Sequence, residues 1–149
     1  MAQYLIDTNV LLRLVVPKAA QHSHAAQAVK TLLARGEELL LAPQVLMEFW
    51  SVATRPQDVN GYGWTAADTG IEVGRLLAQF PLLPETPAVF AEWLRLVGAR
   101  GTIGKQVHDA HIVALLNVHG VNHLLSFNVE DFGGYGISVV SPESISTGS

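Results

Sequence analysis

The chain has 149 residues, a length at which one compact domain is expected. Its hydrophobic content of 49% supplies a sizeable core, yet no apolar run reaches the roughly 20 residues that a membrane-spanning helix needs. It has no cysteine, which excludes disulfides and cysteine-based zinc sites, and its N-terminus shows no signal-peptide pattern. We therefore expect a cytoplasmic protein that does not contact membranes.

The net charge of −4 has the wrong sign for a protein that holds nucleic acid through its overall electrostatic field. A phosphate-containing substrate would need a local patch of positive charge or a metal ion as intermediary. Taken singly, each basic residue is typical of solvated surface. The candidates for such a patch are Arg13, Lys18, Arg55, Arg100 and Lys105.

The expected elements begin with a buried strand over residues 3–7 and a short helix that Pro17 ends. Further helices are predicted over 23–35, 43–54, 65–80, 86–100 and 106–119, and short strands over 39–42, 82–83, 123–127 and 137–140. Residues from about 143 are expected to fray. Strands that alternate with helices predict a single α/β domain over 1–149, with three layers, α/β/α, and a central, mainly parallel sheet.

Asp7 stands where the first strand should become a helix. Sites in parallel α/β sheets lie at the carboxyl ends of strands, and Asp is seldom buried without a compensating partner. Asp7 could simply cap the following helix or contribute to a functional site. Its position alone leaves both interpretations open.

Other polar side chains also lie near element boundaries. Glu48 lies in an otherwise apolar helix and either faces solvent or points into a pocket. Asp109 is near a helix start, where the macrodipole favours an acid, while Asn128 and Asp131 follow a strand and suit a turn. Gathered at one sheet edge, such carboxylates would repel one another unless a cation neutralised them. Oxygen ligands favour Mg²⁺ or Mn²⁺ over zinc, and such ions support phosphodiester hydrolysis.

This ordered set of motifs resembles the PIN-domain ribonucleases and, among them, the VapC toxins of toxin–antitoxin pairs. The matching parts are Glu48 and residues 6–11, 109–112 and 126–132, and the similarity spans residues 3 to about 140. The resemblance implies a Mg²⁺-dependent endoribonuclease, with Mn²⁺ as a possible substitute. It also implies an RNA substrate, a homodimer and inhibition by a cognate antitoxin.

Carried over position by position, the resemblance makes Asp7 and Asp109 the principal metal ligands and Glu48 the third acid. Asn128 stands where many members have Asp, whereas Asp131 matches the acid of an Asn-x-x-Asp-Phe variant, so the fourth acidic position stays open. The family's polar residues that orient metal ligands or water correspond in this sequence to Thr8, Asn9 and Ser126.

Two alternatives remain beside the ribonuclease. A phospho-receiver-like signalling domain also keeps an acidic Mg²⁺ pocket at strand ends, but it needs a phospho-acceptor Asp after a central strand, and the middle acid here is Glu48. A catalytically degenerate PIN-like binding module is the other, because Asn128 replaces an acid. Self-association is expected from apolar side chains on several helices: Leu32, Leu33, Trp50, Leu76, Leu77, Trp93 and Leu94.

Overall fold

Parallel strands form a sheet at the centre of the computed structural model, which describes residues 2–147. The strand order is β2-β1-β3-β4. The strands are β1 (Gln3–Ile6), β2 (Glu38–Leu40), β3 (His123–Leu125) and β4 (Ser138–Val140). Leu5 of β1 is in register with Leu40 of β2 and Leu124 of β3, and Leu124 is in register with Val139 of β4. The carboxyl ends of all these strands therefore meet at one edge of the sheet.

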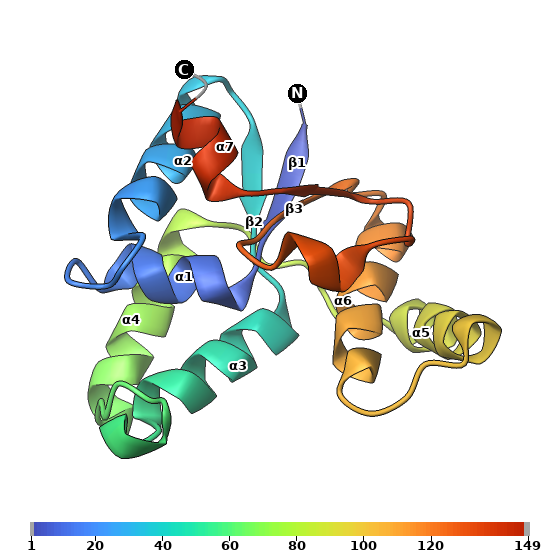
Figure 1. Cartoon of the computed structure of the whole chain (residues 1–149), viewed down its shortest axis with the longest axis horizontal. Helices are drawn as coiled ribbons and strands as arrows, with labels where there is room; N and C mark the ends of the chain where they lie inside the picture. The colour runs from blue at the N-terminus through green and yellow to red at the C-terminus, as the bar shows by residue number, and fades with distance from the viewer. Residues whose placement is uncertain (1, 148–149) are drawn as a thin grey trace.

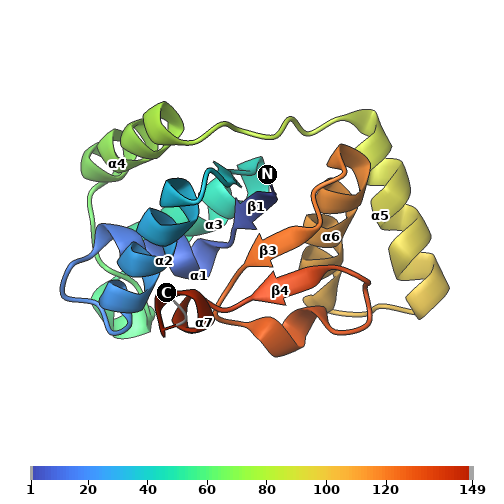
Figure 2. The same ribbon diagram turned by 90° about the horizontal axis from the view of Figure 1, so that it is seen from above.

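Helices lie on both sides of this sheet (Figures 1 and 2). One side carries α1 (Thr8–Val15), α2 (His22–Ala34) and α7 (Pro142–Thr147), and the other carries α5 (Pro87–Arg100) and α6 (Gln106–His119). Helix α3 (Pro43–Thr54) packs against α1 and α4 (Ala66–Gln79). Short 3₁₀ turns are η1 (Gln57–Val59) and η2 (Val129–Phe132). The predicted three-layer α/β/α architecture with a parallel sheet is confirmed.

Local signals account for several of the helix boundaries. Pro43 and Pro87 occupy the first turns of α3 and α5, where a missing N–H leaves no bond unmade. The hydroxyl of Thr65 accepts a hydrogen bond from the N–H of Asp68 at 3.0 Å and caps α4. Gly120 closes α6 with a φ of 68°, a left-handed conformation that suits glycine.

The core positions the elements that carry the polar edge of the sheet. Leu5, Ile6, Leu124 and Leu125 of the central strands are fully enclosed, and residues 112–116 of α6 are buried beside them. Phe132, buried at the end of η2, fixes the segment after β3 to this core. Between residues 2 and 147, no helix has the length and apolar character needed to cross a membrane.

Three expectations need correction. The chain does not fray from residue 143: α7 runs to Thr147 and Ile145 is buried in the core beside α2, while residues 148–149 lie outside the described part. The strand expected over 82–83 is reduced to a single bridge between Leu82 and Leu41. Leu32 and Leu76, expected on a contact surface, are core residues because α2 and α4 turn these positions inward.

Candidate active site

Asp7 lies at the carboxyl end of β1 and is almost completely enclosed. Its backbone N–H donates to the carbonyl of Leu125 at 2.9 Å, which extends the pairing of β1 with β3 and brings Ser126 alongside. The carboxylate accepts three hydrogen bonds, from the N–H of Thr8 (2.8 Å), the amide of Asn9 (3.2 Å) and the hydroxyl of Ser126 (2.7 Å). Asp7 therefore caps α1 and is also held in one orientation at the sheet edge.

Burial raises the pKa of Asp7 above its ordinary value, and the nearby charge of Glu48 raises it further. The hydrogen bonds from Ser126, Thr8 and Asn9 oppose that rise because they favour the ionised form. A buried carboxylate in this position is best stabilised by a positive charge close by.

The polar residues around Asp7 form a connected network. The Asn9 amide also donates to the hydroxyl of Ser126 at 3.1 Å, and the Asn9 side-chain oxygen accepts from the N–H of Phe127 at 2.9 Å. The Ser126 hydroxyl in turn accepts from the N–H of Asn128 at 3.0 Å. The structure thus brings together two of the predicted supporting residues, Asn9 and Ser126, and ties the start of α1 to the segment after β3.

Glu48 projects from α3 toward the same edge of the sheet. One carboxylate oxygen accepts from the hydroxyl of Thr8 at 3.4 Å, and the other accepts from the side-chain amide of Gln44 at 2.9 Å. The hydroxyl of Thr8 also donates to the carbonyl of Val45 at 3.0 Å, which joins α1 to α3. The side chain of Glu48 is exposed to solvent and also lines a cavity, so the two alternatives for this residue were not exclusive.

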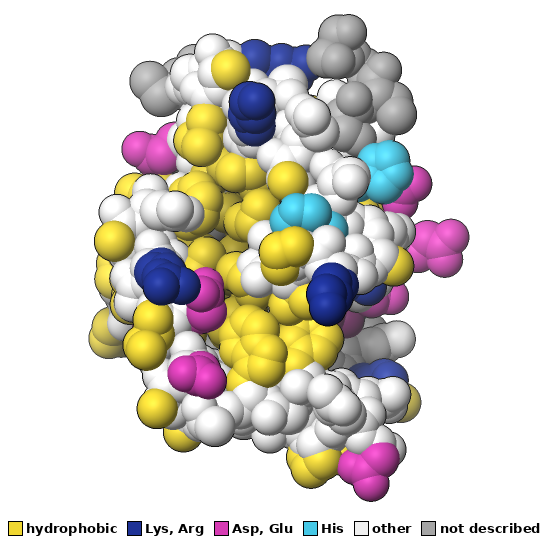
Figure 3. Space-filling view, turned by 90° about the vertical axis from the view of Figure 1, so that its left-hand side faces the viewer, with side chains coloured by type: hydrophobic (Ala, Val, Ile, Leu, Met, Phe, Trp, Pro, Cys, Tyr) yellow, Lys and Arg dark blue, Asp and Glu magenta, His cyan; other side chains and the backbone are white. Residues whose placement is uncertain are grey.

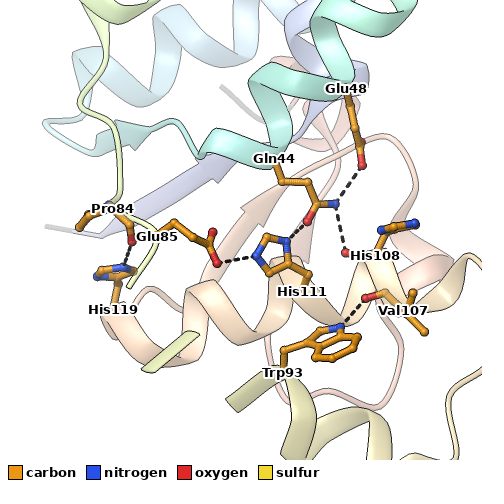
Figure 4. Close-up of polar contacts among 9 residues, drawn as sticks. All are labelled: Gln44, Glu48, Pro84, Glu85, Trp93, Val107, His108, His111 and His119. Atoms are coloured by element: carbon orange, nitrogen blue, oxygen red, sulfur yellow. Dashed lines mark hydrogen bonds and ion pairs between the residues drawn. The ribbon is translucent and has the colours of Figure 1, made fainter. Parts of the chain in front are cut away.

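Gln44 connects Glu48 to α6 and was missed by the sequence analysis. Its amide donates to the carbonyl of His108 at 3.2 Å as well as to Glu48, and its oxygen contacts Nδ1 of His111 (Figure 4). The Nε2 of His111 lies 2.8 Å from a carboxylate oxygen of Glu85. The four-residue spacing of Gln44 and Glu48 on one helix was the only local signal for this contact.

Asp109 lies near the start of α6 and is half-buried. Burial raises its pKa to about 6, and the negative charges of Asp131, Asp7 and Glu48, in that order, contribute to the rise. His108 beside it works in the opposite direction. The carboxylates that the sequence placed near separate element boundaries therefore interact electrostatically.

A cleft of about 490 Å³ collects most of these acids. It is lined by Glu48, Lys105, Gln106, His108, Asp109, Glu130 and Asp131. Asn128 and Asp131 are both exposed, but only Asp131 lines this cleft and raises the pKa of Asp109. Asp7 is buried and is not among the lining residues, although its charge raises the pKa of Asp109. Glu130 is a lining acid that the sequence analysis did not single out.

The donor chemistry of the cleft fits a hard divalent cation. Its potential ligands are carboxylate oxygens, and the negative charges of Asp131, Asp7 and Glu48 add to the effect of burial in raising the pKa of Asp109. Among the described residues, however, no three acidic or histidine side chains are drawn together into a metal-binding group. His111 is engaged by Gln44 and Glu85, which leaves it a structural role rather than that of a ligand.

The fold and the cleft define an α/β domain with an acidic site at the carboxyl edge of a parallel sheet. A family model described as "PIN domain" matches residues 4–133. The chain belongs to the PIN domain family. Comparison with curated protein sequences finds no match.

Several solved structures share this fold at low sequence identity. VapBC2 from Rickettsia felis, bound to a DNA fragment from its promoter, superposes with a TM-score of 0.70 at 11% identity, over 93% of this chain and 98% of the other. A toxin–antitoxin complex from Klebsiella pneumoniae gives 0.64 at 22% identity, over 93% and 97%. VapC20 from Mycobacterium tuberculosis, described as a sarcin–ricin loop cleaving toxin, gives 0.60 at 17%, over 90% and 95%.

Proposed function

We propose that this protein is a Mg²⁺-dependent endoribonuclease and the toxin of a toxin–antitoxin pair, with Mn²⁺ as a substitute metal. The observation that carries the proposal is that Asp109, Asp131 and Glu48 line one cleft of a PIN domain, with the buried Asp7 close enough to raise the pKa of Asp109. Proteins with a similar fold include a sarcin–ricin loop cleaving toxin and toxin–antitoxin complexes, which supports both halves of the proposal. The RNA substrate and an inhibitory partner would both be met in the cytoplasm.

Asp7 and Asp109 would hold the metal, and Glu48 and Asp131 would complete or orient its surroundings. A divalent ion in such a site activates water and neutralises the charge that develops on a phosphodiester. Hydrolysis forms a new bond between the water oxygen and phosphorus, and the ribose oxygen leaves with a proton. The ammonium group of Lys105, on the wall of the cleft, is placed to bind a phosphate oxygen.

The residues around these acids set their positions. Ser126 and Asn9 hold the Asp7 carboxylate in one orientation. Gln44 does the same for Glu48 and links it to the helix that carries Asp109. Because a small misplacement of a ligand weakens a metal site strongly, these contacts should matter for catalysis without touching the RNA.

The direct test is cleavage of end-labelled RNA by the purified protein in Mg²⁺. Asp7→Asn and Asp109→Asn should each lower the rate by more than about 100-fold, the scale seen when a group that stabilises the transition state is removed. Asp58→Asn, an exposed acid on η1, is the matched control and should cleave at the wild-type rate. Wild-type rates for both Asp7→Asn and Asp109→Asn would overturn the assignment of the metal ligands.

Membership of the PIN domain family sets aside the phospho-receiver alternative. The degenerate binding module is distinguished by the same assay. A folded wild-type protein that cleaves no RNA in Mg²⁺ or Mn²⁺ would favour it.

We further propose that the antitoxin docks in an apolar groove formed by α1, α2 and α4. The groove has a volume of about 670 Å³, and Figure 3 shows hydrophobic side chains in a hollow bordered by charged ones on this side of the molecule. Its apolar floor with charges at the edge suits an amphipathic segment of the antitoxin. The lining includes Leu14, Val29, Leu33, Leu76 and Phe80, with Lys30, Glu72 and Arg75 among the charged residues.

The product of a short open reading frame upstream of the gene is the partner to test. It should copurify with the Asp109→Asn variant, and a further Leu33→Arg substitution in the groove should release it. Leu33 is 50% exposed and Leu94, on the far side of the sheet, is 55% exposed, so Leu94→Arg is the matched control. Equal retention by both arginine variants would exclude this groove.

A further inference from the structure

We propose that a second cavity, here called the side pocket, binds an unpaired guanine base of the RNA next to the phosphate that is cleaved. The side pocket has a volume of about 260 Å³. It is lined by Glu85, Phe90, Trp93, Val107, His108 and His111. The inference rests on the proposed ribonuclease function and adds to it the base that the enzyme selects.

The side pocket adjoins the acidic cleft. His108 lines both cavities, and the next residue in α6 is Asp109. One sugar joins a nucleobase to its phosphate, so a base in the side pocket leaves that phosphate at the acidic cleft. The two cavities are therefore arranged as neighbouring parts of one binding surface for a nucleotide.

One wall of the side pocket is an aromatic surface. The rings of Phe90 and Trp93 have centroids 5.6 Å apart and planes inclined by 32°. Phe90 is 62% exposed, whereas Trp93 is half-buried and its indole N–H donates to the carbonyl of Val107 at 2.8 Å (Figure 4). Single-stranded RNA is commonly recognised by stacking of unpaired bases on such rings, and a ring already fixed in place loses little entropy on binding.

The side pocket is also lined by the carboxylate of Glu85, which can select the base. One oxygen of Glu85 is held by Nε2 of His111 at 2.8 Å, and Gln44 holds the other side of that imidazole. Among residues 2–147, no side chain or backbone group makes a hydrogen bond to the second oxygen of Glu85. An ionised carboxylate only accepts hydrogen bonds, so it requires a base edge that donates.

Among the four bases, guanine best provides an edge that donates hydrogen bonds. Its ring N–H and its neighbouring amino group both donate from the same edge. Adenine and cytosine place a ring acceptor beside their amino group, and uracil places carbonyl oxygens on both sides of its N–H. Each of these would bring a lone pair toward the Glu85 carboxylate, which would weaken binding.

The test measures binding separately from cleavage. Fluorescence anisotropy with the Asp109→Asn variant as background should show that the labelled tetranucleotide UGUU binds more tightly than UUUU. Replacing guanine by inosine, which lacks the amino group, should give an intermediate affinity. Phe90→Ala should weaken UGUU binding by roughly 5- to 150-fold, the range for one lost base–aromatic stack, and Phe90→Tyr should restore it.

Two matched controls keep this result specific. Leu94→Ala changes an exposed residue of the same helix outside the side pocket, and it should leave UGUU binding unchanged. Glu85→Gln should bring UGUU close to UUUU in affinity, whereas Glu38→Gln, at another partly exposed acid, should preserve the difference. Equal affinities for UGUU and UUUU, or equal losses in the pocket and control variants, would overturn the proposal.

The remaining outcomes separate this inference from the proposed function. A wild-type protein that cleaves RNA while the pocket variants keep normal binding refutes the side pocket alone. Loss of UGUU binding in Phe90→Ala, with no cleavage by the wild type, supports the pocket and refutes the ribonuclease. A changed molar mass for Phe90→Ala in light scattering would instead assign Phe90 to a contact between two copies and overturn the base site.

Discussion

Replacing Asp109 by asparagine should make the metal-free protein more stable at neutral pH, because the folded chain disfavours this negative charge. The pKa of Asp109 rises from its usual 3.8 to about 6, chiefly through burial and then through Asp131, Asp7 and Glu48. A rise of about 2 in pKa corresponds to about 3 kcal/mol in the fully ionised state. Solvent reaches this half-buried side chain and screens its charge, so about 1–2 kcal/mol is a better expectation.

The sign of the pH dependence follows from which state loses its proton first. Below about pH 4 the carboxyl is protonated in the folded and unfolded chains alike, and Asp109→Asn should change little. Between pH 4 and 6 the unfolded chain ionises first, so the wild type loses stability as the pH rises. Above pH 6 the full difference applies and Asp109→Asn should be more stable.

Thermal unfolding in EDTA at pH 4 and pH 7 measures this difference. A gain of 1–2 kcal/mol should raise the melting temperature by roughly 2–8 °C at pH 7 in a chain of this size. Added Mg²⁺ should stabilise the wild type more than Asp109→Asn, because the cation compensates the same charge. Asp58→Asn is the surface control. A variant that is no more stable than the wild type at pH 7, or equally stabilised at both pH values, would refute the reasoning.

Further predictions concern the metal, the fourth acid and self-association. Cleavage should vanish in EDTA and return with Mg²⁺ or Mn²⁺, and cleavage that persists in EDTA would exclude the metal mechanism. Asp131→Ala should lower the pKa of Asp109 and weaken Mg²⁺ binding in calorimetry, whereas Asn128→Ala should change both quantities little. A larger loss of Mg²⁺ affinity in Asn128→Ala than in Asp131→Ala would assign the fourth acidic position to Asn128. Light scattering should show a homodimer. The side chain of Met47 is apolar, 69% exposed and beside Trp50, so Met47→Asp should dissociate the dimer, whereas Ile103→Asp should not. A monomeric wild type would refute the dimer and this interface.

The strands of the central sheet and most helix boundaries could be predicted from the sequence because their signals are local, whereas the strand expected over 82–83 could not. Each of these signals depends only on residues a few positions away in the chain. The structure has the strand before Asp7, the cap at Thr65 and the helix end at Gly120 where the sequence predicts them. The tail was harder, because its Ser-rich composition suggests fraying while the burial of Ile145 against α2 depends on a contact across most of the chain.

The residue types of the acidic site were also visible in the sequence, but their arrangement was not. The sequence left Asp7 open to a helix cap or a site, and only the pairing of β1 with β3 shows that this cap also contacts Ser126 at the sheet edge. The sequence could not distinguish Asn128 from Asp131, and only the structure shows that Asp131, on η2, lines the cleft while Asn128 does not.

Long-range hydrogen bonds account for what the sequence alone did not reveal. Gln44, His111 and Glu85 come from three separate segments, and the contact of Gln44 with His111 joins residues 67 positions apart. No local preference encodes such a contact, because it exists only after α3 and α6 have packed on the sheet. Local chemistry thus determined the elements and the acids of this protein, and packing decided which side chains face one another across the cleft.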